Sequence, residues 1–434
     1  MKLKDIIEEY ISGDWGDDVP SDETPHAIYC VRGADIVPIS NTSFETIPKR
    51  YISEKSKRSR SLSSGDIVIE KSGGSPTQST GRVCYISDKL VENKHYVVCS
   101  NFCCAVRIKK NWNPKFVYYY WQYIYNCGIF FNFEGKTSGL KNLQLENALS
   151  AIDIPDVPRD KQDAIVQTLS TYEDKIALNR EINRNLEAMA RQLYDYWFVQ
   201  FDFPDSEGKP YKSSGGKMVW NDILKREIPD GWEAAQLNNW LEIKSGFPFK
   251  SESYTTFGRY KIITIKNVQD GELITSDCEF VDNVPSRVKD YVYLKIGDRL
   301  ISLTGNCGRL CVVCEDNLLL NQRVGLLYCE DLHLEYCYNL LNSNCMKMEI
   351  DNLANGAAQA NLSPIELCKA NCVMPPKAIL IEYAKSADTI RKTIIRNSQE
   401  ISQLTKQRDE LLPLLMNGQV SVMRRAVNCD LSHD

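Results

Sequence analysis

The residues that could support nucleotide chemistry or metal binding do not assemble into a recognisable motif. Residues 135–137 read Gly-Lys-Thr, like the end of a phosphate-binding loop, but the glycine required five residues before Gly135 is replaced by Phe130. Cys311 and Cys314 form a Cys-x-x-Cys pair, and no second pair follows at the spacing of a zinc site. The chain has four histidines, none at a metal-like spacing from another: His26, His95, His333 and His433. The sequence therefore predicts no metal site.

Motifs for nucleophilic catalysis and base methylation are also missing. The sequence contains neither Gly-x-Gly-x-x-Gly nor Gly-x-Ser-x-Gly. The nearest approach to the Asn-Pro-Pro-aromatic motif expected of a base methyltransferase is Asn-Pro-Lys-Phe at 113–116. We therefore interpret the chain as a binding protein and not as an enzyme.

Hydrogen-bonding side chains gather in two polar loops that follow the same short motif. Gly-Asp-Ile-Val-Ile at 65–69 precedes a polar loop that leads to Gly-Arg-Val-Cys at 81–84. Gly-Asp-Arg-Leu-Ile at 297–301 precedes a shorter polar loop that leads to Gly-Arg-Leu-Cys at 308–311. Both copies have the pattern of a strand, a loop and a strand. The sequence therefore predicts an internal duplication in which the framework is shared and the loop chemistry is not.

The match resumes downstream of each loop. Gly-Lys-Thr-Ser at 135–138 leads to Asn142, and Gly-Ala-Ala-Gln at 356–359 leads to Asn361. In the second copy, Ser-Pro-Ile-Glu at 363–366 has the form of a capping box with proline in the first helical turn. This pattern predicts that a short helix begins there.

The strongest repeat is a long helical pattern that ends each half of the chain. Pro158 opens the first pattern and Pro376 the second, and seam residues then recur at alternating spacings of four and three. The first seam is Ile165, Leu169, Tyr172, Ile176, Asn179, Asn183, Leu186, Ala190, Leu193 and Trp197. The second seam is Tyr383, Ala387, Ile390, Ile394, Asn397, Ile401, Leu404, Arg408, Leu411 and Leu415. Because counterparts keep one offset (376 − 158 = 218), we expect two coiled-coil helices, with Asn179 and Asn397 fixing their register.

These patterns predict an α/β (α+β) protein with two modules separated by two long antiparallel helices and related by a pseudo-twofold axis. The expected boundaries are a first module at 1–157, a helix at 158–201, a connector at 202–231, a second module at 232–375, a helix at 376–418 and a tail at 419–434. At about 1.5 Å per residue, each helix would span roughly 50–60 Å. That length suits duplex DNA, in which half-sites one helical turn apart lie about 34–36 Å from each other.

Charge is distributed unevenly along the chain, whose formal net charge is −5. Residues 49–110 contain 13 Lys+Arg and 5 Asp+Glu (+8), whereas residues 1–48 contain 3 and 10 (−7). The basic segment is either a solvated face or a footprint for phosphate groups. Without an export signal or a long apolar run, we expect a cytoplasmic protein whose 16 cysteines stay reduced.

Several segments resemble the DNA specificity subunits of type I restriction-modification systems. They are Asn-Arg-Glu-Ile-Asn at 179–183, Leu-Glu-Ala-Met-Ala at 186–190, Trp-Phe-Val at 197–199, Tyr-Lys-Ser-Ser-Gly-Gly-Lys-Met-Val at 211–219, Glu-Ile-Pro-Asp-Gly-Trp at 227–232, Ile-Lys-Ser-Gly-Phe-Pro-Phe at 243–249 and Leu-Leu-Pro-Leu-Leu-Met-Asn-Gly-Gln-Val at 411–420. The resemblance covers nearly the whole chain but not residues 423–434. It implies two target-recognition domains that each read one half of a split, asymmetric DNA site, with the paired helices setting the distance between them.

The resemblance also implies partners for the chain. Two methyltransferase subunits would dock on the helices and methylate adenine with S-adenosylmethionine, and motor-nuclease subunits would need ATP and Mg²⁺. The chain itself would bind no cofactor and would direct methylation and restriction without catalysis. The alternatives are an orphan specificity subunit and a coiled-coil adaptor that binds protein instead of DNA.

The candidate DNA-contacting residues are donors and acceptors on the two polar loops and on the segments that follow them. In the first module they are Lys71, Gln78, Thr80, Arg82, Lys136, Lys141 and Asn142. In the second they are Thr304, Asn306, Arg309, Gln359 and Asn361, with Lys250 and Lys266 as candidates for phosphate contact. Because both copies keep the arginine at Arg82 and Arg309, a framework role is the competing interpretation for these two residues.

Overall fold

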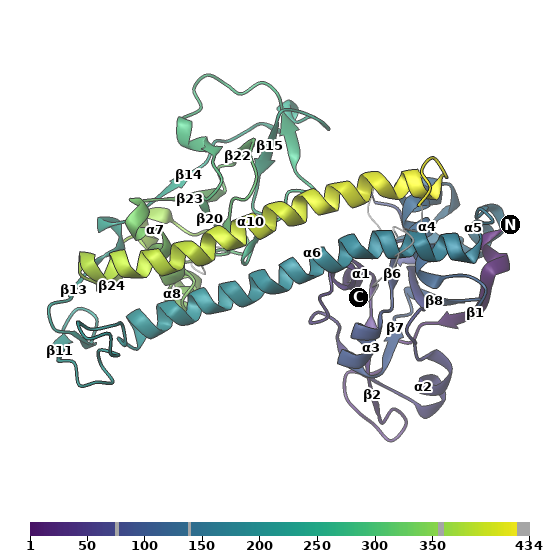
Figure 1. The fold of residues 1–434 in the computed structure, drawn as a ribbon, viewed down its shortest axis with the longest axis horizontal. Coiled ribbons are helices and arrows are strands. Elements are labelled where there is room, and N and C mark those ends of the chain that lie inside the picture. The colour runs from purple at the N-terminus through teal and green to yellow at the C-terminus, as the bar shows by residue number, and fades with distance from the viewer. Residues whose placement is uncertain (74–77, 138–139, 355–359, 423–434) are drawn as a thin grey trace, which may run out of the picture. The chain divides into compact units, whose positions relative to one another are not determined.

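The computed structural model of the chain describes residues 1–434 except 74–77, 138–139, 355–359 and 423–434. The chain forms two compact units, whose elements are labelled in Figure 1. Unit 1 consists of Met1–Ala177 and Gln403–Asp434, and unit 2 consists of Leu178–Ser402. Unit 1 is therefore built from both ends of the chain, whereas unit 2 is one continuous segment.

Each unit contains a four-stranded antiparallel sheet with the same strand order. In unit 1 the order is β1-β8-β4-β6, made of Ile7–Ser12, Cys103–Ile108, Ile67–Glu70 and Val83–Tyr85. In unit 2 the order is β14-β23-β20-β21, made of Glu242–Ser245, Val324–Tyr328, Arg299–Ser302 and Leu310–Val312. The Gly-Asp motif precedes β4 in unit 1 and β20 in unit 2, and the Gly-Arg motif leads into the neighbouring strand in both. The predicted duplication is thereby confirmed.

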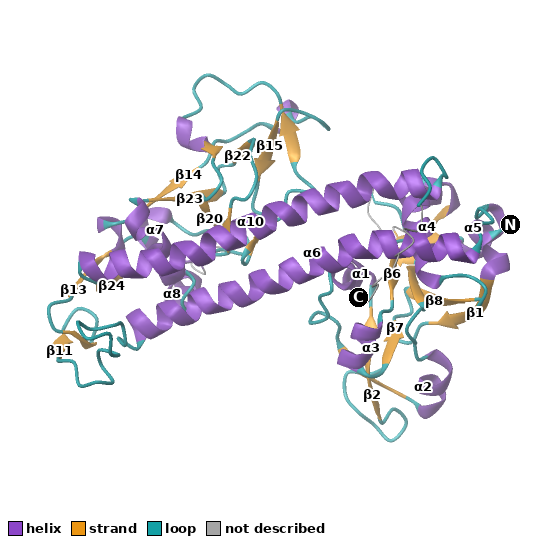
Figure 2. Ribbon diagram, viewed as in Figure 1, coloured by secondary structure: helices purple, strands orange, loops and turns teal. Residues whose placement is uncertain are grey.

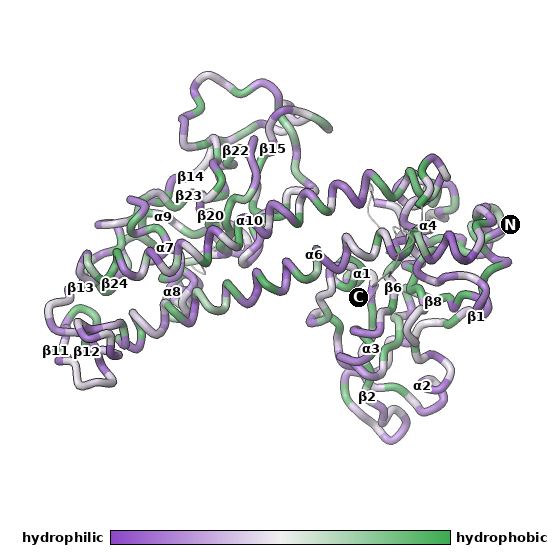
Figure 3. Tube along the Cα trace, viewed as in Figure 1, coloured by the Kyte–Doolittle hydropathy of each residue, from purple (hydrophilic) through white to green (hydrophobic). Residues whose placement is uncertain are grey.

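A second sheet is also repeated, and it contains a parallel pair that the sequence patterns did not indicate. In unit 1, β2 (His26–Val31) pairs antiparallel with β3 (Lys49–Ile52) and parallel with β7 (Val97–Cys99). In unit 2, β15 (Tyr260–Ile263) pairs antiparallel with β18 (Glu279–Val281) and parallel with β22 (Leu318–Leu320), and β19 (Tyr293–Leu294) extends the sheet. Apolar residues of both sheets pack together in one of the cores of each unit, and strands such as β8, β20 and β22 run through hydrophobic segments in Figure 3.

Short helices and small sheets complete the two units. Unit 1 adds α1 (Ile36–Ser40), α2 (Glu54–Arg60), α3 (Asp88–Lys94), α4 (Pro114–Asn126), α5 (Leu145–Ala151) and a sheet of β5 (Ser72–Gly73), β10 (Leu140–Leu143) and β9 (Glu134–Thr137). Unit 2 adds α7 (Asp331–Leu341), α8 (Asn344–Ala354), α9 (Pro364–Leu367) and the pairs β11-β12 (Met218–Asn221, Arg226–Pro229), β13-β24 (Glu233–Gln236, Asn371–Met374) and β16-β17 (Val268–Gln269, Glu272–Leu273). The helix start predicted from the capping motif is confirmed, because the Ser363 side chain accepts a hydrogen bond from the Glu366 amide at the start of α9.

Two long helices carry the heptad-like pattern, and each is drawn as one unbroken helix in Figure 2. Helix α6 covers Arg159–Tyr194 and continues as a π-helical turn to Val199, and α10 covers Lys377–Met416. At about 1.5 Å per residue these helices are roughly 54 and 60 Å long. Every seam residue of the sequence pattern is buried or half-buried, so the periodicity identified the covered face of each helix.

Within unit 2 the two helices run antiparallel and share a layer of polar contacts. Asn179 Nδ2 donates to Glu400 Oε2 at 2.9 Å, and Asn397 Nδ2 donates to Asn183 Oδ1 at 3.0 Å. Asn183 Nδ2 in turn donates to Ser398 Oγ at 3.1 Å. The two asparagines of the repeat therefore bond to different partners on the facing helix and not to each other.

The connector at 202–231 is more ordered than its composition suggests. It contains the hairpin β11-β12, and its apolar residues Phe203 and Ile228 belong to the core of unit 2 together with Trp232. The Phe203 ring stacks on the Trp232 ring with centroids 4.9 Å apart. The alternation Met-Val-Trp at 218–220 was the sequence signal for this hairpin, and the surrounding glycine and serine masked it.

Among the described residues, every helix is too short or too polar to serve as a bilayer-spanning segment.

Candidate nucleic-acid interface

In the first polar loop, Ser72–Gly73 form strand β5 of the small sheet β5-β10-β9 of unit 1. Strand β10 pairs with β5 on one side and with β9 on the other, and the Leu143 amide donates to the Lys71 carbonyl at 2.7 Å. This arrangement brings together six of the seven residues predicted in this module: Lys71, Gln78, Thr80, Arg82, Lys141 and Asn142. The seventh, Lys136, lies on β9, and its side chain is outside the described residues.

The Gly-Lys-Thr segment lies on strand β9 and not at the start of a helix. A phosphate-binding loop needs a turn that leads into a helix, so that backbone amides converge on the phosphate. This finding agrees with the exclusion of a phosphate loop by the missing glycine.

Arg82 is engaged in a two-point ion pair with Glu70. Its Nε lies 2.8 Å from Glu70 Oε2, its Nη2 lies 2.6 Å from Oε1, and Nη2 also donates to the Gly33 carbonyl at 3.1 Å. The Glu70 side chain is only 4% exposed, and its hydrogen bonds raise the pKa of Arg82. Because a buried carboxylate needs a cation beside it, this pair favours the framework interpretation of Arg82.

Thr80 and Lys141 are linked through a second carboxylate, Glu134. The Thr80 amide donates to Glu134 Oε1 at 2.7 Å, and Lys141 Nζ lies 3.2 Å from Glu134 Oε2. Burial alone would raise the pKa of Glu134, but the bond from the Thr80 amide and the bond and charge of Lys141 lower it below its usual value. Thr80 is fully buried, so both residues contribute to the order of the loop.

The remaining residues of this loop lie at or near the surface. Gln78 is exposed and its carbonyl accepts from Lys141 Nζ at 3.2 Å, and the Ser72 hydroxyl donates to Asn142. Lys71 lines a hollow of about 530 Å³ together with the exposed ring of Tyr10. Both features place hydrogen-bonding groups where a ligand could reach them.

The second polar loop, residues 302–307, lies beside the segment that carries Asn361. Thr304 and Asn361 form an antiparallel bridge, and the Gly305 amide donates to the Ala360 carbonyl at 3.1 Å. Asn306 and Asn361 are exposed, and the buried Thr304 hydroxyl has no hydrogen-bond partner among the described residues. The predicted Gln359 lies outside the described residues. The structure thus brings Thr304, Asn306 and Asn361 together in unit 2.

Arg309 closes this loop and has a neutral partner. Its Nη1 donates to Gln269 Oε1 at 2.6 Å, and its backbone amide donates to Ser302 Oγ at 3.0 Å. Lys266 is close by, because its carbonyl accepts from Gln269 Nε2 at 2.9 Å, and its own ammonium is 3.9 Å from Glu279. Lys250 is exposed on another segment and is not brought to this loop by any described contact.

Ion pairs join the acidic N-terminal strip to the basic segment at 49–110. Arg50 pairs with Asp18, Arg60 lies 3.5 Å from Asp14, and Arg107 pairs with Glu9. The positive charge of this segment is therefore compensated in part within unit 1, which weakens the footprint interpretation. Sequence reasoning passed over the basic run Lys-Ser-Lys-Arg-Ser-Arg at 55–60, which forms most of α2.

Of the two cysteines of the Cys-x-x-Cys pair, Cys311 lies in a core of unit 2, and the half-buried Cys314 packs against one. Cys311 is fully buried on β21, and burial raises the pKa of its thiol well above the ordinary value. Burial also raises the pKa of Cys314, to about 11. Thiols with such raised pKa values are neutral and behave as small apolar side chains.

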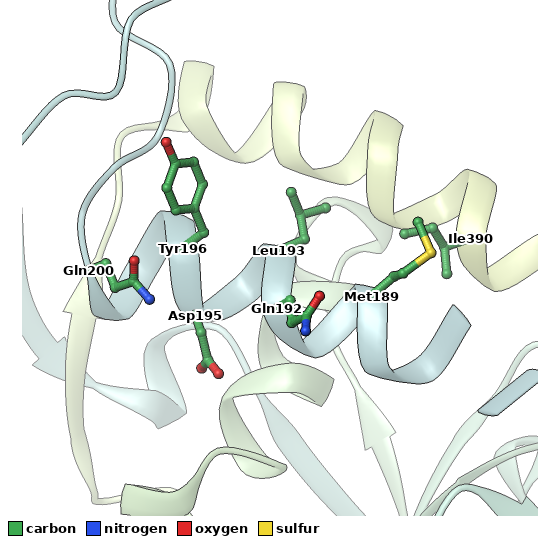
Figure 4. Close-up of a pocket in the computed structure, with 7 residues that line it drawn as sticks. All are labelled: Met189, Gln192, Leu193, Asp195, Tyr196, Gln200 and Ile390. Carbon is green, nitrogen blue, oxygen red and sulfur yellow. The ribbon is translucent and has the colours of Figure 1, made fainter. Parts of the chain in front are cut away.

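A surface hollow of about 550 Å³ lies between the two long helices of unit 2 (Figure 4). Six of its lining residues come from α6 and the turn that follows, and Ile390 comes from α10: Met189, Gln192, Leu193, Asp195, Tyr196 and Gln200. Burial raises the pKa of the Asp195 carboxyl despite the nearby charge of Arg191. This hollow lies on the helices and holds none of the predicted DNA-contacting residues.

Comparison with known proteins shows which proteins this chain is similar to. Residues 39–188 match the family model described as type I restriction modification DNA specificity domain. The chain is 26% identical over 297 residues to the type I restriction enzyme MjaIX specificity subunit of Methanocaldococcus jannaschii, covering 64% of this chain and 62% of that protein. It is 24% identical over 318 residues to the type I restriction enzyme HindI specificity subunit of Haemophilus influenzae, covering 62% and 69%.

The fold is similar to that of a solved protein. The crystal structure of a type I restriction-modification system S subunit from M. genitalium aligns with a TM-score of 0.52 and 14% identity, over 96% of this chain and 95% of that one. At this identity the likeness shows a shared fold. Together, the sequence and fold comparisons confirm the resemblance to type I DNA specificity subunits.

Proposed function

We propose that this chain is the DNA-reading subunit of a type I restriction-modification complex and that each unit reads one half of a split DNA site. The observation that best supports this is the repeated scaffold. Both units have the same sheet order, and they differ in the polar loops between β4 and β6 and between β20 and β21. Equivalent positions with unlike side chains are what two readers of unlike bases require.

The two loops offer different hydrogen-bonding groups. At the first loop Gln78 is exposed and the half-buried Lys71 lines a surface hollow, and at the second loop Asn306 and Asn361 are exposed. Amide side chains can bond to the N6 and N7 edge of adenine, and lysine can bond to the O6 and N7 edge of guanine. Two half-sites of different sequence follow from this difference, and the split site would be asymmetric.

The proposed partners are two methyltransferase subunits that dock on the helices and use S-adenosylmethionine, and motor-nuclease subunits that use ATP and Mg²⁺. Apolar side chains exposed on the helices of unit 2 support docking: Leu178 is 56% exposed, Met189 53% and Ile381 41%. In this proposal the chain has no catalytic role and acts in the cytoplasm, where partner subunits modify adenines at the sites that it selects.

The decisive test is to map adenine methylation in host DNA with and without the gene for this chain. We expect a split motif that disappears on deletion and returns with the gene on a plasmid. Identical methylomes would contradict the proposal and favour the protein-binding adaptor.

Exchanging residues 71–80 for the loop of another specificity subunit is expected to change one half of the motif and leave the other half intact. The reason is that this loop belongs wholly to unit 1, whereas the second loop belongs to unit 2. Methylome sequencing reads both halves at once. Simultaneous loss of both halves, at an unchanged level of folded protein, would argue against two independent readers.

Salt dependence separates DNA binding from an adaptor role. A complex of this chain and its methyltransferase partners that neutralises several phosphates should bind its site about 10³-fold more weakly at 200 mM than at 50 mM salt. An adaptor that binds protein instead of DNA should not bind the duplex at either salt concentration. Binding can be followed by fluorescence anisotropy with a labelled duplex that contains the mapped motif.

A further inference from the structure

We infer that Arg309 of unit 2 contacts the DNA through its guanidinium, whereas Arg82, its counterpart in the repeat, only holds unit 1 together. The inference rests on the proposed function and assigns different roles to two residues that the repeat makes equivalent. The contacted group is a pair of acceptors on one strand, either the O6 and N7 edge of guanine or the oxygens of a phosphate.

The backbone around both arginines is the same. Gly81 and Gly308 precede them, with φ of +93° and +81°, a conformation that strongly favours glycine. Each glycine also packs closely, because a Cβ at Gly81 would lie 3.1 Å from Phe130 and one at Gly308 would lie 2.7 Å from Ile350. Packing and backbone conformation therefore both require glycine at these two positions. Each arginine follows its glycine and directly precedes an equivalent strand, β6 or β21.

The side-chain partners of the two arginines differ in charge. Arg82 is paired at two points with the buried carboxylate of Glu70, whereas Arg309 donates to the neutral amide of Gln269. Among the described residues no carboxylate forms an ion pair with Arg309, although Asp270 and Glu272 belong to the same hairpin. Residues 355–359, which are not described, read Asn-Gly-Ala-Ala-Gln and add no acid.

An arginine whose partner is neutral interacts more favourably with an anionic or strongly polar ligand than an arginine whose charge is already compensated by a carboxylate. Moving Arg82 onto DNA would leave Glu70 buried without a cation, which opposes the movement. Moving Arg309 leaves only the Gln269 amide oxygen, which water can satisfy at the surface. The charge of Arg309 is thus available to a ligand, and that of Arg82 is not.

The neighbours of Arg309 point to the same ligand. Exposed Asn306 lies on the loop that Arg309 closes, Asn361 forms a bridge to Thr304 of that loop, and the buried hydroxyl of Thr304 has no partner among the described residues. Asn306 and Asn361 offer amide groups of the kind that reads base edges, and Arg309 lies at the end of the loop that carries Asn306.

The test uses Arg309→Ala and Gln269→Glu in the full chain, expressed with its partner subunits. The second change supplies the carboxylate that Arg82 already has, and should hold the Arg309 guanidinium in the same way without removing it. Both variants should weaken binding to the mapped site about 10- to 100-fold, with only the half-site of unit 2 affected in the methylome. Gln236→Glu is the matched control, because Gln236 is an exposed amide of unit 2 whose described side-chain contact is with Asn238 and not with an arginine.

The pattern of loss identifies the acceptor. Relaxed specificity at one position of that half-site assigns a guanine edge, and an even loss over all sequences assigns a phosphate. Unchanged affinity and methylation in both variants would overturn the inference. If deletion of the whole gene left the methylome unchanged, the proposed function would fail first, so the two failures are distinguishable.

Arg82→Ala completes the comparison. It should lower the thermal stability of the chain, because it leaves Glu70 uncompensated, while Arg309→Ala should melt like the natural protein. Equal losses of stability in the two variants would show that both arginines are framework residues, and the inference would be wrong.

Discussion

Inserting seven residues into each long helix is expected to lengthen the spacer between the two half-sites by about three base pairs. The insertions would lie between Ala177 and Leu178 and between Ser402 and Gln403, where the two units divide. Seven residues extend a helix by about 10.5 Å, and three base pairs of duplex rise by nearly the same distance. Seven residues also restore the four-and-three spacing of the seam, so that the same face stays covered.

The spacer length is the quantity to measure, because affinity will fall as well. Three extra base pairs turn the duplex by roughly 100°, while a heptad returns a helix almost to its starting face. The DNA would have to untwist, which costs energy and weakens binding. An insertion in α6 alone is the control: with α10 unchanged, Ile165 and Leu169 would be out of register with Leu412 and Leu415, with which they share a core, and the chain should be destabilised. Methylation at an unlengthened spacer in the double insertion would contradict the ruler role of the helices.

Replacing Glu335 by glutamine is expected to destabilise unit 2 by about 4 kcal/mol, because it leaves two buried guanidinium groups without their shared carboxylate. Glu335 on α7 is 2% exposed and pairs with Arg299 of β20 and with Arg391 of α10, which are 4% and 1% exposed. Arg391 also pairs with Glu187 of α6. Neither arginine can lose its proton at accessible pH, so the variant must bury uncompensated charge.

The acid dependence of this network has a definite sign. Burial alone would raise the pKa of Glu335, but Arg299 and Arg391 lower it below its ordinary value. A carboxyl whose pKa is lower in the folded state stabilises that state at pH values above its unfolded pKa of about 4.3. That stabilisation is lost as the pH falls through the pKa that Glu335 has in the folded state. The free energy of unfolding of the natural protein should therefore exceed that of Glu335→Gln by the largest amount at pH 7, and the excess should decrease in acid.

Urea unfolding at pH 7 measures this effect, and a matched glutamate provides the control. Glu366 on α9 pairs with Lys369 at 2.7 Å, and both side chains are about half exposed. Glu366→Gln should change the free energy of unfolding by less than about 1 kcal/mol, because exposed ion pairs contribute little. Similar unfolding midpoints for the two variants would show that the buried network does not stabilise unit 2.

The features that sequence predicted well are those that repeat along the chain. The four-and-three spacing from Ile165 and from Tyr383 marked the covered faces of α6 and α10, because helical periodicity is local. The Gly-Asp and Gly-Arg motifs marked equivalent strand ends, because a fixed backbone turn needs fixed residue types. The loops between them were recognised as the variable part for the same reason.

What sequence could not supply was the partner of each side chain. Arg82 and Arg309 look identical in the chain, and only the fold shows a carboxylate beside one and an amide beside the other. The signal for the first was Glu70, an acid that directly follows the apolar run of β4 and so had to be paired. The sequence contains no comparable indication that Gln269 is the partner of Arg309, because Gln269 lies on a hairpin far from Arg309 in the sequence. The parallel pairing of β2 with β7 was missed because it joins segments far apart in sequence.

The division of unit 1 between the two ends of the chain has a consequence for biosynthesis. Leu412, Leu415 and Met416 are buried in the same core as Ile165 and Leu169. At about 5–20 residues per second, the ribosome needs roughly 10–50 s to proceed from Ala177 to Met416. During that time unit 2, a continuous segment, can complete its fold while the nascent amino-terminal half still lacks part of its core. A premature stop codon before Leu411 would therefore destabilise unit 1, most of which is translated first, because its core would lack Leu412, Leu415 and Met416.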